Sequence, residues 1–406
     1  MSRAELEHLT EGQRLYPVDL THAEAAALNH SGLVTAQPDV DGWRITAEHA
    51  VGAIQRGDLV VRVTPKVGVV QVLTLLARAQ GVKGLKVDDH LVGVARTADL
   101  SAVLAVLFAQ ETATAMAAGP LRGYRSEDQT LPVLRGRVRL REQHLRRFGL
   151  PVPLEVNVDE WTLDTDDNRR LRAATVALLD LPDVPGDVRK TLLRLNRTLN
   201  EAKLPAIGAP LAPWVATRLN ARLHRLLHLA DIVLAHASVE HDKGATQTHG
   251  FVVNMAWLFE TLIARLLDED TRGLVTQETL PLDSLRRLSI RPDLVFHDQS
   301  GAGAVAVADT KYKLLDDSGN FPNADAYQLV TYCARLGLTI GHLIYAAGDP
   351  QPEPFEILGT DVRLVVHAVD ISRPVEEIER QALLLAARLL GGACGVASRG
   401  HDLAAT

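Results

Sequence analysis

A strand–turn–strand pattern in the last third of the chain most constrains how it can fold. Two largely apolar runs, residues 288–296 and 304–308, flank a glycine-rich turn, which predicts a β-hairpin. Asp293 lies in the first run, and Asp309 and Lys311 follow the second. Antiparallel neighbours would bring the two carboxylates together. Because an unpaired carboxylate at the end of a buried strand is costly, the pattern predicts a functional site.

These residue types suit the hydrolysis of a phosphodiester bond. That reaction needs a hard cation such as Mg²⁺, held by carboxylate oxygens, and a positive side chain that orients water or stabilises charge on phosphorus. Asp293 and Asp309 can hold one or two Mg²⁺ ions, and Lys311 can supply the positive charge. Lys313 follows on the same strand face, either as a contact to the scissile strand or as a plain surface lysine.

Helical patterns flank the hairpin on both sides. A helix predicted over residues 251–267 carries Glu260, which is either a further carboxylate near the metal or a solvent-facing glutamate. A helix predicted over residues 324–336 places Gln328 and Tyr332 on one face, where they either contact a DNA phosphate, brace the site or simply belong to a half-buried amphipathic helix. Further strand and helix patterns complete an α/β unit, over residues 341–346, 362–369 and 374–390.

The length and the changes of pattern predict several domains. The 406 residues exceed one domain of about 100–200 residues. We predict a multi-domain α/β protein with four parts. These are a mixed β/α N-terminal domain (residues 1–150), a helical middle segment (151–245), the α/β unit with the site (246–391) and a flexible tail (392–406). In the N-terminal domain we expect strands over 41–46 and 58–64 and helices over 69–79 and 102–117. The middle segment should contain helices over 188–200 and 213–237.

An arginine-rich window, residues 122–147, stands out in a chain whose net charge is −7. Arg135, Arg137 and Arg139 alternate with other residues, which predicts that they share one face of a strand with apolar residues on the other face. Such a face either grips phosphates or an acidic partner surface, or is merely solvated. The acidic total argues against general affinity for nucleic acid but is compatible with a local basic groove.

Several other classes of protein find little support. The longest apolar stretches fall far short of the roughly 18 residues that cross a bilayer, and the N-terminus lacks the apolar core of a secretory signal. Cys333 and Cys394 are too few for a disulfide framework or a four-cysteine metal site, so we expect a cytoplasmic protein without membrane contact. His224 and His228 share a helix face, but no glutamate follows His224 as a zincin requires.

The order of these motifs resembles a known superfamily. Glu260, Pro292-Asp293, Asp309-Thr310-Lys311 and Gln328-x-x-x-Tyr332 are similar to the PD-(D/E)xK nucleases, in particular to members with a Gln-x-x-x-Tyr helix. Other segments resemble the McrC family, the nuclease subunits of restriction systems directed at modified cytosine: residues 61–68, 134–137, 164–169 and 254–260. The resemblance touches most of the chain between about residues 50 and 345.

This resemblance implies a C-terminal restriction-endonuclease-like α/β domain and a Mg²⁺-dependent endonuclease that acts on double-stranded DNA. It implies roles for residues in three groups: Asp293, Asp309 and Lys311 in catalysis; Asp293, Asp309 and Glu260 around the metal; and Gln328, Tyr332 and Lys313 in support or DNA contact. Because cutting both DNA strands takes two active sites, we expect two copies in the active assembly.

The resemblance also implies a partner. McrC-like proteins work with McrB, a GTP-hydrolysing AAA+ motor that recognises modified DNA, and the N-terminal part of McrC docks into the motor ring and stimulates its hydrolysis. The chain has no Gly-x-x-x-x-Gly-Lys-[Ser/Thr] loop, so the partner would bind the nucleotide. The arginines at 135, 137 and 139 are candidates for contact with the motor or with DNA.

Two competing interpretations stay open. One is a regulatory subunit that keeps an idle nuclease fold and only stimulates the motor, although the intact Asp293, Asp309 and Lys311 argue against it. The other is a stand-alone RecB-like nuclease. The branch of that group with an iron–sulfur cluster needs more than two cysteines.

Overall fold

The chain folds into several sheets flanked by helices, which confirms the predicted multi-domain α/β class. The computed structural model describes residues 3–82, 100–148, 150–181, 184–206, 209, 211–240, 248–271, 273–298, 303–314, 322–348 and 354–390. The tail predicted over 392–406 lies outside these residues, as does Cys394. None of the helices described combines the length and apolar character that crossing a bilayer requires.

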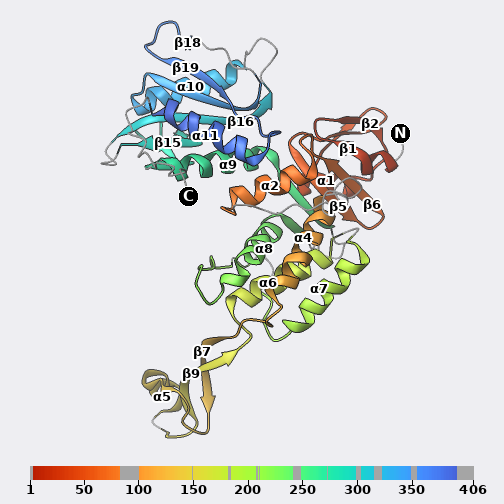
Figure 1. The fold of residues 1–406 in the computed structure, drawn as a ribbon, viewed down its shortest axis with the longest axis vertical. Coiled ribbons are helices and arrows are strands. Elements are labelled where there is room, and N and C mark those ends of the chain that lie inside the picture. The colour runs from red at the N-terminus through yellow and green to blue at the C-terminus, as the bar shows by residue number, and fades with distance from the viewer. Residues whose placement is uncertain are drawn as a thin grey trace, which may run out of the picture.

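The N-terminal unit contains two sheets (Figure 1). A small antiparallel sheet has the strand order β2 (Arg14–Val18), β4 (Gly42–Thr46), β3 (Thr35–Asp39). It packs with the helix α1 (His22–Ser31). The second sheet has the order β1-β6-β5-β11-β10, with bounds Leu9–Thr10, Leu59–Thr64, Ala50–Arg56, Thr248–Asn254 and Ala237–Glu240. A short 3₁₀ helix, η1 (Arg3–His8), precedes β1. The strands predicted over 41–46 and 58–64 are confirmed as β4 and β6.

The next two helices match their predicted ranges closely. α2 (Val69–Ala79) and α4 (Leu100–Ala115) correspond to the patterns at 69–79 and 102–117. α4 is buried on most of its surface because it packs against α2, α7, α8 and the five-stranded sheet. α2 packs against α9, a helix of the C-terminal unit.

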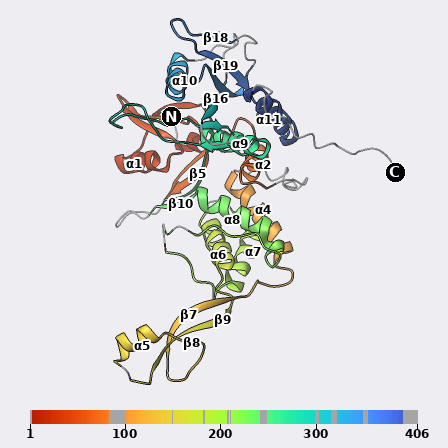
Figure 2. The ribbon, with the colours of Figure 1, turned by 90° about the vertical axis from the view of Figure 1, so that its left-hand side faces the viewer.

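A three-stranded arm projects from the far end of the helical segment, away from the C-terminal unit (Figure 1; Figure 2 shows it from the side). It consists of β7, β8, β9 and α5, with bounds Gly123–Leu131, Arg137–Val138, Leu154–Thr162 and Leu140–Arg147. The strand predicted to carry three alternating arginines is wrong, since only Arg137 and Val138 are extended. Gly136 has φ +75°, which breaks the strand, and no core covers the apolar side, where Leu134 is 66% exposed.

The middle segment is helical, as predicted, but with a later last helix. It contains α6, α7, the 3₁₀ turn η2 and α8, with bounds Asp166–Leu179, Gly186–Thr198, Ala221–Leu223 and His224–His236. Thr165 caps α6 by accepting a hydrogen bond from the Asn168 backbone N–H at 3.3 Å. The helix predicted over 213–237 is wrong before residue 221, because Asn220 binds Asp167 and Thr217 and holds that stretch outside a helix.

The C-terminal unit is a six-stranded sheet in the order β12-β15-β16-β17-β19-β18. Its strands span Leu274–Thr276, Leu294–His297, Ala304–Leu314, Ile340–Ala347, Arg363–Ala368 and Phe355–Glu356. The remaining elements are the strands β13 and β14 and the helices α9, α10 and α11, with bounds Leu280–Pro281, Ser289–Ile290, Met255–Asp270, Asn323–Leu336 and Val375–Leu389. The predicted hairpin is confirmed as β15 and β16, although its turn, residues 299–302, lies outside the described residues.

Alternating residues of the central strands face two cores. Phe296 and Ile344 pack in the large core that includes α9 and α11, whereas Val295 and Leu343 pack with Leu329 of α10 in a smaller core. This alternation is what a strand period of two requires when helices cover both faces.

Three details differ from the predicted element ranges. The strand expected over 288–296 is split into β14 and β15, with Pro292 between them, because proline cannot donate to the sheet ladder. The helix expected from residue 251 begins at Met255, since 251–254 pair with β5 as part of β11. Strand pairs span residues 150 and 245, and the domain division proposed at those positions stays a prediction.

Candidate active site

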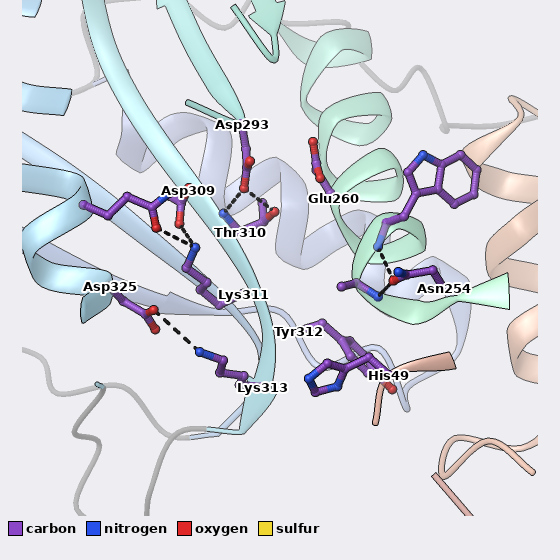
Figure 3. A pocket seen from close by; sticks show the side chains of 13 residues that line it. His49, Asn254, Glu260, Asp293, Asp309, Thr310, Lys311, Tyr312, Lys313 and Asp325 are labelled. Atoms are coloured by element: carbon purple, nitrogen blue, oxygen red, sulfur yellow. Dashed lines mark hydrogen bonds and ion pairs between the residues drawn. The ribbon is translucent and has the colours of Figure 1, made fainter. Parts of the chain in front are cut away.

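The hairpin brings two carboxylates to one place. Leu294 of β15 pairs with Ala308 of β16, so Asp293 and Asp309 lie side by side at the point where β15 begins (Figure 3). The Thr310 backbone N–H and hydroxyl donate to Oδ2 of Asp293 at 2.8 and 2.9 Å. These two hydrogen bonds fix the orientation of the Asp293 carboxylate.

Asp309 is buried and ion-paired with Lys311. The aspartate is 1% exposed, and the Lys311 ammonium also donates to Oε1 of Gln328 at 3.1 Å. Burial and the negative charge of Asp293 raise the pKa of Asp309 to about 7, against the opposing effect of Lys311. Burial lowers the pKa of Lys311, but the charge and hydrogen bond of Asp309, together with the charge of Asp293, raise that pKa overall.

Glu260 reaches the same cavity from α9. Gln277 donates a hydrogen bond to its carboxylate. Burial raises the pKa of Glu260, and the Gln277 hydrogen bond opposes the shift. The cavity has a volume of about 500 Å³, and Glu260, Asp293, Asp309 and Lys311 all line it.

The helix α10 braces the site through the pair predicted on one of its faces. Gln328 lines the cavity, and its Nε2 donates to the Tyr332 hydroxyl at 2.6 Å. Tyr332 is 4% exposed and donates to the backbone oxygen of Arg291 at 3.3 Å. Its burial favours the bracing interpretation over a direct DNA contact.

Lys313 also lines the cavity, from the same face of β16 as Lys311. Its ammonium lies 3.6 Å from Oδ1 of Asp325, and its side chain is 44% exposed. The Tyr345 hydroxyl donates to the other oxygen of Asp325 at 2.7 Å. Lys313 is therefore held by Asp325 at the edge of the cavity.

The arginine cluster lies elsewhere, on the projecting arm (Figure 1). Arg135 pairs with Glu160 at 3.3 Å and Arg139 with Asp128 at 3.0 Å, so part of its charge is neutralised within the arm. Arg137 is exposed on β8. The structure therefore brings together every predicted site residue except these three.

Histidine and cysteine candidates take structural positions. The His224 and His228 rings pack against Trp214, and their centroids lie 5.2 and 4.8 Å from the centroid of the Trp214 ring. Cys333, on α10, is fully buried in the smaller core. In these positions the three side chains contribute to packing.

Sequence reasoning gave no site role to several residues that line the cavity, among them His49, Asn254, Tyr312 and Asp325. Asn254 caps α9, and an asparagine before a helical run is a recognisable N-cap signal. Asp325 lies one turn before Gln328 on α10. No local signal marks His49, because it reaches the cavity only through the pairing of β5 with β11.

The donor chemistry suits Mg²⁺. Asp293, Asp309 and Glu260 offer only carboxylate oxygens, which this cation prefers, and the raised pKa of the buried Asp309 beside a like charge marks a place that a cation would stabilise. Among the residues described, no three His, Cys, Asp or Glu side chains converge as one ligand set. The two aspartates therefore fit the ion best, since Glu260 is turned toward Gln277.

Comparisons with known proteins give the family and the fold. The family model described as McrBC 5-methylcytosine restriction system component matches residues 45–346. No curated protein matches the chain. A chain in the refined half-complex from the tetradecameric assembly of Thermococcus gammatolerans McrB AAA+ hexamers with bound McrC is 18% identical, with a TM-score of 0.57 over 95% of this chain and 99% of that one.

A second solved structure, the cryo-EM structure of the Thermococcus gammatolerans McrBC complex, is 22% identical over 64% of this chain and 87% of that chain, with a TM-score of 0.40. The family match carries more weight, because it spans most of the sequence and includes every residue of the cavity described above. The chain therefore belongs to the family of McrBC 5-methylcytosine restriction system components, and the predicted kinship with McrC is confirmed.

Proposed function

We propose that this chain is the DNA endonuclease subunit of a modification-dependent restriction system and requires Mg²⁺. The observation that carries the proposal is the buried Asp309 beside Asp293, with Lys311 paired to it, in a cavity of about 500 Å³. Two carboxylates and an ammonium group match the needs of phosphodiester hydrolysis, namely a cation site and a positive side chain near the attacked phosphorus. The nuclease assignment also agrees with the PD-(D/E)xK order of the motifs.

Each residue would have a distinct part in the reaction. Asp293 and Asp309 would hold one or two Mg²⁺ ions, with Glu260 as a further carboxylate. Bound Mg²⁺ supplies a Lewis acid and lowers the pKa of water. Lys311, held by Asp309 and Gln328, would orient the attacking water for in-line displacement at phosphorus. Thr310 would keep the Asp293 carboxylate aimed at the cavity.

We propose further that the chain works with a GTP-hydrolysing AAA+ motor and stimulates it. The Thermococcus gammatolerans assembly contains McrB AAA+ hexamers with bound McrC, which supports a partner of the same kind here. The motor would bind GTP and modified DNA, and two copies of this chain would cut the two strands. The arm with Arg135, Arg137 and Arg139 is a candidate for the contact with the motor or with DNA. The assembly would act in the cytoplasm.

The test is cleavage of methylated and unmethylated plasmid with Mg²⁺, with and without GTP and the motor. Lys311→Met should lower the cleavage rate at least about 100-fold, because it removes the positive charge that would orient the attacking water. Asp309→Asn should do the same, and EDTA should abolish cleavage by the wild type. Lys190→Met, on the exposed side of α7, removes an equal charge far from the cavity and should cut normally.

Two results would favour the competing functions. Lys311-dependent cleavage without motor or GTP would point to a stand-alone nuclease. Faster GTP hydrolysis by the motor without any cleavage would point to a regulatory subunit with an idle nuclease fold.

A further inference from the structure

The cavity is not built by the C-terminal unit alone. β11 belongs to the five-stranded N-terminal sheet and leads directly into α9, the helix that carries Glu260. The Met255 backbone N–H donates to the backbone oxygen of His49 at 2.7 Å, and Asn254 accepts from the Ala256 and Trp257 N–H groups. The start of α9 is therefore fixed to the N-terminal sheet.

The strand that carries Lys311 is attached to the same sheet through its next residue, Tyr312. The Tyr312 hydroxyl hydrogen-bonds to the Glu11 carboxylate. Its ring meets the His49 ring edge-on, with centroids 6.0 Å apart and planes at 89° (Figure 3). The Phe259 ring, one residue before Glu260, lies 6.4 Å from the Tyr312 ring. Tyr312 thus contacts the N-terminal sheet and α9 at once.

Glu11 is itself a buried, well-anchored carboxylate. It is 4% exposed, its backbone N–H donates to the Thr64 oxygen at 3.0 Å, and its Oε2 accepts from the Lys66 N–H at 3.3 Å. A buried carboxylate is costly unless hydrogen-bonded, so the Tyr312 hydroxyl is a partner that it needs. Burial and the Glu11 charge raise the pKa of Tyr312 far above its ordinary value, which keeps the hydroxyl protonated as the donor.

We propose that Tyr312 is a positioning residue, which fixes Lys311 relative to Glu260 by tying β16 to Glu11 and His49 of the N-terminal unit. The contact makes the geometry of the cavity depend on the N-terminal sheet. A partner that shifts that sheet would then change the nuclease site without touching it. The consequence for cleavage rests on the proposed function, whereas the tie between the two units does not.

The variant Tyr312→Phe isolates the proposed contact, because it keeps the ring against His49 and Phe259 and removes only the hydroxyl. Tyr16→Phe is the matched control. It also removes a tyrosine hydroxyl that makes a hydrogen bond, here with the Asp41 N–H at 3.2 Å in the small N-terminal sheet. Glu11→Gln is the conservative partner variant, since its amide oxygen can still accept from Tyr312.

Two measurements test the proposal. Hydrogen exchange in peptides covering 304–314 should become about 10-fold faster in Tyr312→Phe, because the variant loses one hydrogen bond to a charged group. It should stay unchanged in Tyr16→Phe. The rate of Mg²⁺-dependent plasmid cleavage should fall about 10-fold at unchanged DNA affinity, measured with Ca²⁺ in place of Mg²⁺. Glu11→Gln should show a smaller loss in both measurements.

The outcomes separate the two hypotheses. Unchanged exchange over 304–314 in Tyr312→Phe would overturn the proposal, as would faster exchange spread evenly over the whole chain, which would indicate a general loss of stability. Faster exchange confined to β16 and the start of α9 would support it even if the wild type proved unable to cut DNA, in which case only the proposed nuclease function would fail.

Discussion

A change at Gln328 can distinguish the effect of the orientation of Lys311 on cleavage from the effect of its charge. Its Oε1 accepts from Lys311 and its Nε2 donates to Tyr332. Gln328→Met keeps the length of the side chain and removes both hydrogen bonds, while the ion pair between Lys311 and Asp309 stays. Supporting residues of this kind are typically worth 10–100-fold in activity, so we expect a loss in single-turnover cleavage of about that size with unchanged DNA binding.

The matched control for this change is Gln55→Met on β5, which loses a hydrogen bond to the backbone oxygen of Gly57. Equal cleavage rates in the two variants would show that Gln328 does not orient Lys311.

Residues whose direction follows from local periodicity were predictable. Asp309, Lys311 and Lys313 share a face because they alternate along one strand, and Gln328 and Tyr332 because they lie four apart on a helix. His49 and Tyr312 were not predictable as neighbours. Their contact depends on β5 pairing with β11, which no local pattern in the sequence encodes.

Among the elements, the junction between the arm and α6 depends on Asp164. The carboxylate accepts from the Lys203 backbone N–H at 2.7 Å and pairs with Arg169 of α6 and with Arg125 of β7. The hydrogen bonds from Arg169, against the opposing effect of burial, lower the pKa of Asp164 to about 2. A carboxyl whose pKa is lower in the folded state stabilises the fold above its unfolded pKa of about 3.9 and loses this effect as pH falls toward 2.

Asp164→Asn should therefore lower the free energy of unfolding by about 2 kcal/mol at pH 7. The difference from wild type should shrink below pH 4, because Asp164 of the unfolded wild type then takes up a proton, and should vanish only as pH falls below the folded-state pKa of about 2. Urea denaturation at pH 7 and pH 3 measures both values, with the exposed Asp58→Asn as control. A difference between variants that is the same at both pH values would contradict the assignment.

The element ranges show where pattern recognition succeeds and where it fails. The predicted bounds of α2, β17 and α11 agree nearly to the residue with the structure, because the apolar residues that set each pattern pack in a hydrophobic core. The pattern predicts helix over residues 251–254, which instead belong to β11, because a short apolar run has no distinct period. The arm departed furthest from prediction, since its apolar residues face solvent and alternation without a core does not extend a strand.

At the scale of the whole molecule, the N-terminal and C-terminal units are joined through α2. Arg78 of α2, whose side chain is 5% exposed, donates two hydrogen bonds to Glu269 of α9 at 2.8 and 2.9 Å and one to Glu379 of α11. Gln71, also on α2, donates to the backbone oxygens of Ile371 and Arg373. These contacts join residues some 200 to 300 positions apart, which no sequence pattern indicated.

Arg78→Met should lower the free energy of unfolding by about 2–4 kcal/mol, because it removes three charge-assisted hydrogen bonds and leaves two carboxylates without their shared cation. It should also split one calorimetric transition into two, since the units lose the charged link that Arg78 forms with α9 and α11. Arg78→Lys keeps the charge but not the planar guanidinium that binds both oxygens of Glu269. Its free energy of unfolding should therefore lie between those of the wild type and Arg78→Met. A single transition at the wild-type temperature in Arg78→Met would mean that the apolar packing of α2 against α9 joins the units without this arginine.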